Sequence, residues 1–412
     1  MQDLVRPFRA LRPVPEHAAE VVAPPYDVVS RDEAAALAAG KPRSFLRVSR
    51  AEIELPPDAS PYDAAVYARA AENFRRLARD GVLVRDDAPS YYVYRMTMDG
   101  HAQTGVAFVA SVAAYERHRI RRHELTRPDK ENDRVRHIEA LNAQTGPVLC
   151  AYRADAALAA LATEAATERP LLDVEGPNAV RHSVWRVAEP ERVGRFSAAL
   201  NALEALYIAD GHHRSAAAAR VAAARRRGAP GADASHEYFL TVAFPHDAMR
   251  ILDYNRVVRD LNGLSAERLL ERLAESFVVR RSAAPVRPER SGVFGLYVAH
   301  AWYRLELPER AIPRDDPVAA LDVSLLQDRV LGPLLGIGDP RTDPRIDFVG
   351  GVRGLAELER RVDAGDAAAA FSLHPTQMEQ LMAVADAGRL MPPKSTWFEP
   401  KLADGLLSHV LG

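Results

Sequence analysis

The chain has 412 residues, too many for one compact core, which predicts two or three domains. Apolar residues make up 48% of the sequence and charged residues 27%, the balance of an ordinary soluble globular protein. Its 54 basic and 56 acidic side chains leave a formal net charge of −2, so no global field would attract nucleic acid or anionic lipid.

The distribution of apolar residues and cysteine predicts a cytoplasmic protein that does not span a membrane. The longest apolar runs, such as residues 106–112, have the length of a strand rather than of a transmembrane helix. No apolar stretch follows the arginines near the N-terminus, so we expect no secretory signal. Cys150 is the only cysteine, which excludes an internal disulfide and a multi-cysteine metal site and indicates a reducing compartment.

Helix and strand patterns alternate along the chain. In its first part the expected elements are a helix at 62–77, strands at 91–98 and 103–112, a helix after the charged residues 117–136, and a buried strand around Cys150. The dipeptide Asp99-Gly100 between the first two strands is a strong signal for a β-hairpin. Further along, helices are expected at 155–168, 215–227, 266–277 and 376–387, and strands around Val184 and at 206–209, 238–244, 293–298 and 368–373. This alternation predicts a mixed α/β or α+β fold.

One loop between a strand and a helix is dense in polar chemistry. It separates the apolar strand 206–209 from the next helix and consists of Asp210, Gly211, His212, His213 and Arg214. A strand, a glycine turn and a helix N-terminus together offer free backbone N–H groups and the positive end of the helix dipole to an anion. Gly211 lets the backbone approach a phosphate closely, and Arg214 offers it a bidentate contact. Neutral histidines donate to phosphate oxygens, and Asp210 is the candidate ligand for Mg²⁺.

Two other interpretations of this loop stay open. In the first, the loop is only a surface turn that carries a histidine pair. In the second, the two histidines ligate a metal ion. Adjacent residues on a turn usually point apart, however, and no third histidine or cysteine lies nearby in the sequence. We therefore favour a phosphate site.

The run 207–214 resembles the phosphate-binding motif of the ParB/sulfiredoxin-like fold, in the version found in archaeal free L-serine kinases. Nearly the whole chain is also similar to a large bacterial and archaeal family catalogued as a domain of unknown function, through the segments 7–10, 23–27 and 392–396. The resemblance implies an α/β (mixed α+β) protein with a ParB/sulfiredoxin-like core and additional N-terminal and C-terminal α/β segments. The expected domains are an N-terminal α/β domain at 1–110, a phosphate-binding core at 111–260, and a C-terminal α+β domain at 261–412 that completes the site.

A charged segment from Arg121 to Arg127 is the first companion motif. The serine kinases have a His-Glu dipeptide at the matching place, and its glutamate is taken to be the general base that removes the proton from the substrate hydroxyl. The resemblance implies that role for Glu124, and weaker substrate contacts for His123, Thr126 and Arg127. A phosphoacceptor alcohol needs such a carboxylate within hydrogen-bond reach as the phosphoryl group arrives. The alternative is a solvated charged loop, as most charge runs are.

The second companion motif, near the C-terminus, is the run Lys394, Ser395 and Thr396 after two prolines. The serine kinases carry a similar Pro-Lys followed by two hydroxyl residues. A lysine beside hydroxyls suits a phosphate clamp, because it combines a mobile charge with two neutral donors. The kinases continue with a histidine, where this chain has Trp397 and Phe398, a departure that bears on the identity of the donor or of the acceptor pocket. A C-terminal docking segment is the alternative.

The N-terminal segment 23–28 has no counterpart that we can match in the kinases. Its two prolines fix an extended backbone, from which Tyr26 and Asp27 close over a site or form a rigid packing turn. We favour the packing turn.

Together these motifs predict a phosphotransferase that moves phosphate from ATP, ADP or pyrophosphate to the hydroxyl of a small metabolite, with Mg²⁺ as cofactor. The resemblance alone makes free L-serine the first acceptor to test. The same fold hosts DNA-binding partition proteins, so the main rival is a ParB-like, nucleotide-binding segregation or regulatory protein. Near-neutral charge and the lack of a recognisable helix-turn-helix argue against nucleic-acid binding. A third interpretation, a phosphate-ester hydrolase, would release phosphate without an acceptor.

Overall fold

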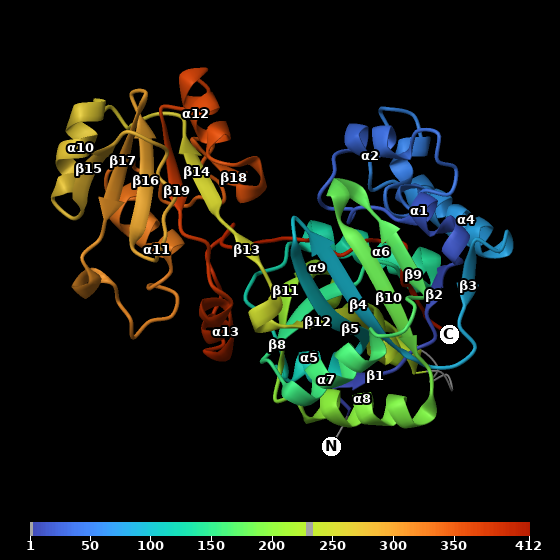
Figure 1. Ribbon diagram of the computed structural model, residues 1–412. Coiled ribbons are helices and arrows are strands. Elements are labelled where there is room, and N and C mark those ends of the chain that lie inside the picture. Colours follow the sequence, from blue (N-terminus) through green and yellow to red (C-terminus); the bar gives the residue numbers. More distant parts are fainter. Residues whose placement is uncertain (1–2, 228–233) are drawn as a thin grey trace. The chain divides into compact units, whose positions relative to one another are not determined.

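Two compact units make up the computed structural model, which describes residues 3–227 and 234–412 (Figure 1). The first unit joins Met1–Met249 to the C-terminal Pro400–Gly412, and the second is Arg250–Glu399. Each unit combines helices with a sheet, which confirms the mixed α/β class expected from the sequence. Among the described helices, none has the length and apolar character that a membrane span needs.

A nine-stranded mixed sheet forms the centre of the first unit. Its order is β6 (Ile120–Arg121), β11 (Leu206–Asp210), β8 (Val148–Tyr152), β12 (Tyr238–Pro245), β5 (His101–Ser111), β4 (Tyr91–Met98), β10 (Arg181–Val187) and β9 (Leu172–Glu175), with β1 (Val5–Arg6) beside β5. Two short pairs accompany it, namely β2 (Leu11–Pro13) with β3 (Leu83–Arg85) and β7 (Ala143–Gln144) with β21 (His409–Val410).

The helices of the first unit pack into two apolar cores. They are α1 (Ala18–Val21), α2 (Arg31–Ala38), α3 (Leu46–Ser49), α4 (Ala64–Arg79), α5 (Val112–Glu116), α6 (Pro128–Leu141), α7 (Ala156–Ala165), α8 (Pro190–Ala202) and α9 (His212–Arg227). The main core joins apolar side chains of the sheet to those of α5, α7, α8 and α9. A second core is built mainly by α2, α3 and α4, with Leu141 from α6. Helix α6 packs against both α4 and α9, so it connects the second apolar core to the main core.

The second unit has its own six-stranded antiparallel sheet. The order is β15 (Val278–Ser282), β17 (Ala301–Glu306), β16 (Val293–Val298), β19 (Ala369–Leu373), β14 (Tyr254–Val258) and β18 (Ile346–Gly350). Its helices are α10 (Ala266–Ala274), α11 (Asp322–Leu326), α12 (Ala356–Asp363) and α13 (Met378–Asp386), and the strands β13 (Ile251–Leu252) and β20 (Trp397–Phe398) pair at its ends.

Local patterns predicted many of the longer elements. The hairpin of β4 and β5 turns at Asp99 and Gly100, both with positive φ, as the dipeptide indicated. Helix α9 begins at His212, three residues before the expected start, because its first main-chain hydrogen bond runs from Ser215 N to Gly211 O (3.0 Å). The expected domain boundary at residue 110 falls inside β5, whose two neighbours β4 and β12 lie on either side of that boundary in sequence. Hydrogen bonding within one sheet therefore joins the segments 1–110 and 111–260.

Candidate functional site

Strand pairing collects the two motifs of the first unit at one end of the sheet. Strand β6 runs parallel to β11, with Arg121 opposite Tyr207, so the chain that continues into His123 and Glu124 reaches the end of β11. Strand β8 runs antiparallel to β11, with Leu149 opposite Asp210. The loop before β8 therefore lies beside the loop after β11.

Gly211 makes the turn from β11 into α9. Its φ of +98° lies in the region that favours glycine, and a Cβ there would lie 3.0 Å from Arg214 Nε and 3.3 Å from Val148 Cα. Because the first hydrogen bond of α9 starts at Ser215 N, the amides of His212, His213 and Arg214 precede the helical ladder. These amides and the dipole of the 16-residue helix favour an anion at this end.

Asp210 lies between two cations. Its Oδ2 is 3.4 Å from Arg214 Nη2 and 3.6 Å from Lys401 Nζ. Burial opposes ionisation of this carboxyl, but Lys401, Arg214 and His212 outweigh it and hold the pKa of Asp210 well below its usual range. Lys401 comes from the C-terminal segment Pro400–Gly412, which belongs to the same compact unit.

The guanidinium of Arg214 is buried and turned towards the protein. Its Nη1 donates to the Pro147 carbonyl, and its Nη2 lies 3.9 Å from Asp27 Oδ2. Its Nε is buried and has no hydrogen-bond partner. Burial disfavours the charge of Arg214, but Asp210 and Asp27 more than compensate and raise its pKa. The N-terminal segment with Asp27 therefore lies beside Arg214 of the loop.

The two adjacent histidines point to different neighbours. His212 is 4% exposed, and its ring packs edge-on against His123, with 4.5 Å between ring centroids. His212 Nε2 accepts from the His123 amide at 3.4 Å, and its Nδ1 lies 3.8 Å from Glu124 Oε2. His213 instead accepts from the Arg127 amide at 3.1 Å through Nε2. The two rings thus contact different residues of the segment 123–127.

Burial keeps both inner histidines neutral. It lowers the pKa of His123 to about 4, although the Ile208 backbone and Asp210 favour the charged form. Burial, followed by repulsion from His123, lowers the pKa of His212 well below its ordinary value. Burial also lowers the pKa of the less buried His213. At neutral pH these rings act as neutral donors or acceptors.

The remaining residues of the charged segment differ in exposure. The Glu124 side chain is 54% exposed, close to His212 at the start of α9. The Thr126 hydroxyl donates to Glu131 Oε1, and the Arg127 guanidinium binds Asp129 at 2.9 Å. Thr126 and Arg127 thus direct their side chains to the first turn of α6, and Glu124 is the exposed carboxylate beside the helix N-terminus.

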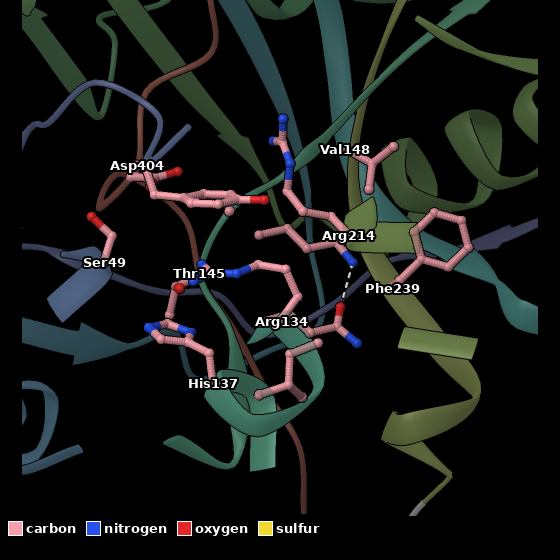
Figure 2. Close-up of a pocket in the computed structure, with 13 residues that line it drawn as sticks. Ser49, Arg134, His137, Thr145, Val148, Arg214, Phe239 and Asp404 are labelled. Atoms are coloured by element: carbon pink, nitrogen blue, oxygen red, sulfur yellow. Dashed lines mark hydrogen bonds between the residues drawn. The ribbon is translucent and has the colours of Figure 1, made fainter. Parts of the chain in front are cut away.

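A cavity of about 440 Å³, part of it open to solvent, has Arg214 of the loop 210–214 in its lining (Figure 2). Arg134, Arg214 and Asp404 are among the residues that line it. The Arg134 guanidinium lies 3.7 Å from the Tyr26 ring centroid and pairs with Asp133 at 2.7 Å. The cavity is therefore lined by the buried cation of Arg214, the mostly buried cation of Arg134 and the buried carboxyl group of Asp404.

Asp404 is held in the cavity by strand-like pairing with the N-terminal segment. Its amide donates to the Ala23 carbonyl at 2.9 Å, and the Ala23 amide donates to the Asp404 carbonyl at 3.1 Å. Burial raises the pKa of the Asp404 carboxyl to about 7, against the opposing effect of Arg214. This carboxyl therefore changes its charge near neutral pH.

The C-terminal motif belongs to the second unit and consists of Lys394, Ser395 and Thr396. Hydrogen bonds and a cation–π contact hold its first two residues in place. The Lys394 carbonyl accepts from Arg256 Nη2 at 2.9 Å, and Lys394 Nζ lies 5.7 Å from the Tyr254 ring centroid. Ser395 Oγ donates to the Pro392 carbonyl at 2.6 Å. The loop 210–214 belongs to the first unit, so the phosphate clamp stays a prediction.

Four residues of the site received no role from the sequence pattern, or only an undecided one: Tyr26, Asp27, Lys401 and Asp404. The double proline before Tyr26 was the one local signal. Lys401 and Asp404 follow Pro400, but nothing in their immediate sequence indicates partners on β11 and α9. Their place in the site depends on how the C-terminal segment pairs with residues near the N-terminus.

The chain belongs to the family described as "Protein of unknown function (DUF1015)", whose model matches residues 5–324. No curated protein matches it significantly.

Several solved structures are similar to the chain at low identity. A free serine kinase mutant in complex with AMP is 13% identical, with 71% of this chain and 86% of that chain covered and a TM-score of 0.35. SbnI with a C-terminal truncation from Staphylococcus aureus is 10% identical, with coverages of 72% and 85% and a TM-score of 0.37. A conserved hypothetical protein from Pyrococcus furiosus is 14% identical, with coverages of 74% and 94% and a TM-score of 0.33.

Proposed function

We propose that this member of the DUF1015 family is a phosphotransferase that moves phosphate from a nucleotide or pyrophosphate to the hydroxyl of a small metabolite. One observation carries the proposal: an exposed carboxylate, Glu124, lies beside His212, the first residue of a long helix whose leading amides precede the helical ladder. An anion site and a base within reach of it are the two parts that phosphoryl transfer to an alcohol needs most.

The phosphate donor would bind at the N-terminus of α9. The amides of His212, His213 and Arg214 supply hydrogen bonds to phosphate oxygens, and Gly211 keeps the turn free of a side chain. Lys401 and Arg214 add positive charge near the donor phosphates, although both are also paired with the Asp210 carboxylate. We expect the donor to be ATP, ADP or pyrophosphate, since each presents a terminal phosphate to this end of the helix.

Glu124 would act as the general base. As the acceptor oxygen forms its bond to the terminal phosphorus, the bond from phosphorus to the bridging oxygen breaks and the shortened donor leaves with that electron pair. The acceptor hydroxyl gives its proton to the Glu124 carboxylate. His212 Nδ1 lies 3.8 Å from Glu124 Oε2. When this nitrogen carries the ring proton, its N–H would orient the Glu124 carboxylate.

The cavity supports a small acceptor. Arg134 and Arg214 suit an acceptor carboxylate, and Asp404 suits an ammonium group. Glu124 does not line the cavity, so the acceptor hydroxyl would have to extend from the cavity towards the start of α9 to reach the base. These charges are compatible with an amino acid that carries a hydroxyl, and free L-serine is the first acceptor to test.

Mg²⁺ would enter with the phosphates of the donor. Asp210 already faces Arg214 and Lys401, so its carboxylate retains little charge to attract a further cation. Mg²⁺ commonly keeps several waters and binds through substrate phosphates and one or two carboxylates. We therefore propose a supporting rather than a dominant role for Asp210 in Mg²⁺ binding.

The proposal is tested by incubating the protein with Mg²⁺, each of ATP, ADP and pyrophosphate, and a pool of hydroxylated metabolites. Mass spectrometry should detect a phosphorylated metabolite that depends on both donor and acceptor. Phosphate release that does not depend on an acceptor would indicate a hydrolase instead. Salt-dependent binding of duplex DNA without any phosphorylated product would favour the ParB-like alternative.

A further inference from the structure

Three metal-ligating side chains meet beside the N-terminus of α9. They are His123 and Glu124, which follow β6, and His212, which opens α9. One ligand atom from each residue lies within 4.8 Å of the other two. The parallel pairing of β6 with β11 brings them together across 89 residues of sequence, which is why no metal motif is visible in the sequence.

A second observation concerns the inner histidine. His123 is 2% exposed, and its Nδ1 is buried and has no hydrogen-bond partner. A buried polar nitrogen without a partner is rare, because it has lost its hydrogen bonds to water and gained nothing in exchange. A metal–nitrogen bond is one way to satisfy such an atom.

We propose that His123, Glu124 and His212 bind one divalent transition-metal ion, for which Zn²⁺ is the probe. Two imidazoles and one carboxylate form a ligand set found in zinc and non-haem iron sites, whereas Mg²⁺ prefers oxygen ligands. Three protein ligands leave a coordination position for water or a substrate oxygen.

Binding requires a small contraction of the cluster. Two ligand atoms at about 2.0–2.2 Å from a tetrahedral Zn²⁺ lie about 3.3–3.6 Å apart, so atoms that are now up to 4.8 Å apart must move together by about 1 Å. The Glu124 side chain is 54% exposed, and it would have to rotate towards the two buried rings. Coordination through His212 Nδ1 moves the ring proton to Nε2, so the long 3.4 Å contact from the His123 amide opens.

The metal site has a consequence that rests on the proposed function. Glu124 cannot hold a metal ion and accept the acceptor's proton at the same time. Zn²⁺ should therefore inhibit phosphotransfer, and a chelator should restore it. Metal binding itself does not depend on any phosphotransfer activity.

The test is calorimetric titration of chelator-treated protein with ZnCl₂, with His212→Gln as the variant and His213→Gln as the matched control. The wild type and His213→Gln should bind one Zn²⁺ per chain. His212→Gln should lose more than about 10-fold in affinity, because even partners outside the ligand set contribute that much. Co²⁺ in place of Zn²⁺ should show the visible absorption of a nitrogen- and oxygen-ligated ion, and His212→Gln should remove it.

Equal Zn²⁺ affinity of His212→Gln and His213→Gln, or no stoichiometric binding by the wild type, would overturn the metal site. Glu124→Gln is the second variant if His212→Gln does not fold, because the Glu124 side chain is 54% exposed. Phosphotransfer without Zn²⁺ binding would remove the metal site and leave the proposed function standing. Zn²⁺ binding without phosphotransfer towards any acceptor would keep the metal site and remove the proposed function.

Discussion

Acid should destabilise the first unit through histidines that fold in their neutral form. His137 on α6 is 5% exposed, and its Nε2 lies 3.1 Å from the Val48 carbonyl, to which it donates as a neutral ring. Burial lowers its pKa from 6.5 to about 4, with Arg134 contributing in the same direction. The unfolded chain therefore binds a proton between these two pH values and the folded protein does not. The stabilisation is complete above pH 6.5 and is lost as the pH falls towards 4.

The structure sets the size of the effect. A pKa that moves between 6.5 and about 4 on folding corresponds to about 3 kcal/mol of unfolding free energy, lost once the pH reaches 4. His182 on β10 is also buried, and burial lowers its pKa to about 4. The two histidines lie on different elements, so their contributions should add.

The assay is urea denaturation at pH 7.5 and pH 4.5, followed by circular dichroism. His137→Gln keeps a donor for the Val48 carbonyl but does not titrate, so its loss of stability between the two pH values should be about 2.5 kcal/mol smaller than that of the wild type. The double variant with His182→Gln should lose about twice as much of the pH dependence. Identical pH dependence in the wild type and His137→Gln would refute the reasoning that this histidine folds neutral.

Three further predictions concern the site. Glu124→Gln should lower turnover on the true acceptor by about 10²–10⁴-fold, and single-turnover kinetics should show little change in donor affinity. Near-normal turnover in a variant with an unchanged melting curve would show that Glu124 is not the base. Arg214→Ala should weaken donor binding by about 1.5–3 kcal/mol in a calorimetric titration, and unchanged affinity for every donor would contradict its phosphate role. If the C-terminal motif forms a clamp, a crystal structure with donor bound should have Lys394 and Asp210 in one cleft, and their presence on opposite faces would remove that hypothesis.

Local features of the sequence determined much of the fold. The hairpin of β4 and β5 follows from two apolar runs around Asp99-Gly100, and the helix α4 from its apolar periodicity. Cys150 is fully buried in β8, as its apolar surroundings predicted, and burial raises the pKa of its thiol. The strand, glycine turn and helix around Gly211 were also predictable, because neighbours in sequence form all three.

Only the tertiary structure decided which residues surround that turn. The parallel pairing of β6 with β11 brings His123 against His212, and the C-terminal segment brings Lys401 to Asp210. The buried Asp404 reaches the cavity by pairing with the N-terminal segment. Such contacts depend on sheet order and on chain segments that return from far along the sequence, and neither leaves a periodic local pattern. The sequence by itself thus determined the strand, glycine turn and helix around Gly211, whereas the charged side chains and histidines around that turn were decided by the pairing of distant segments.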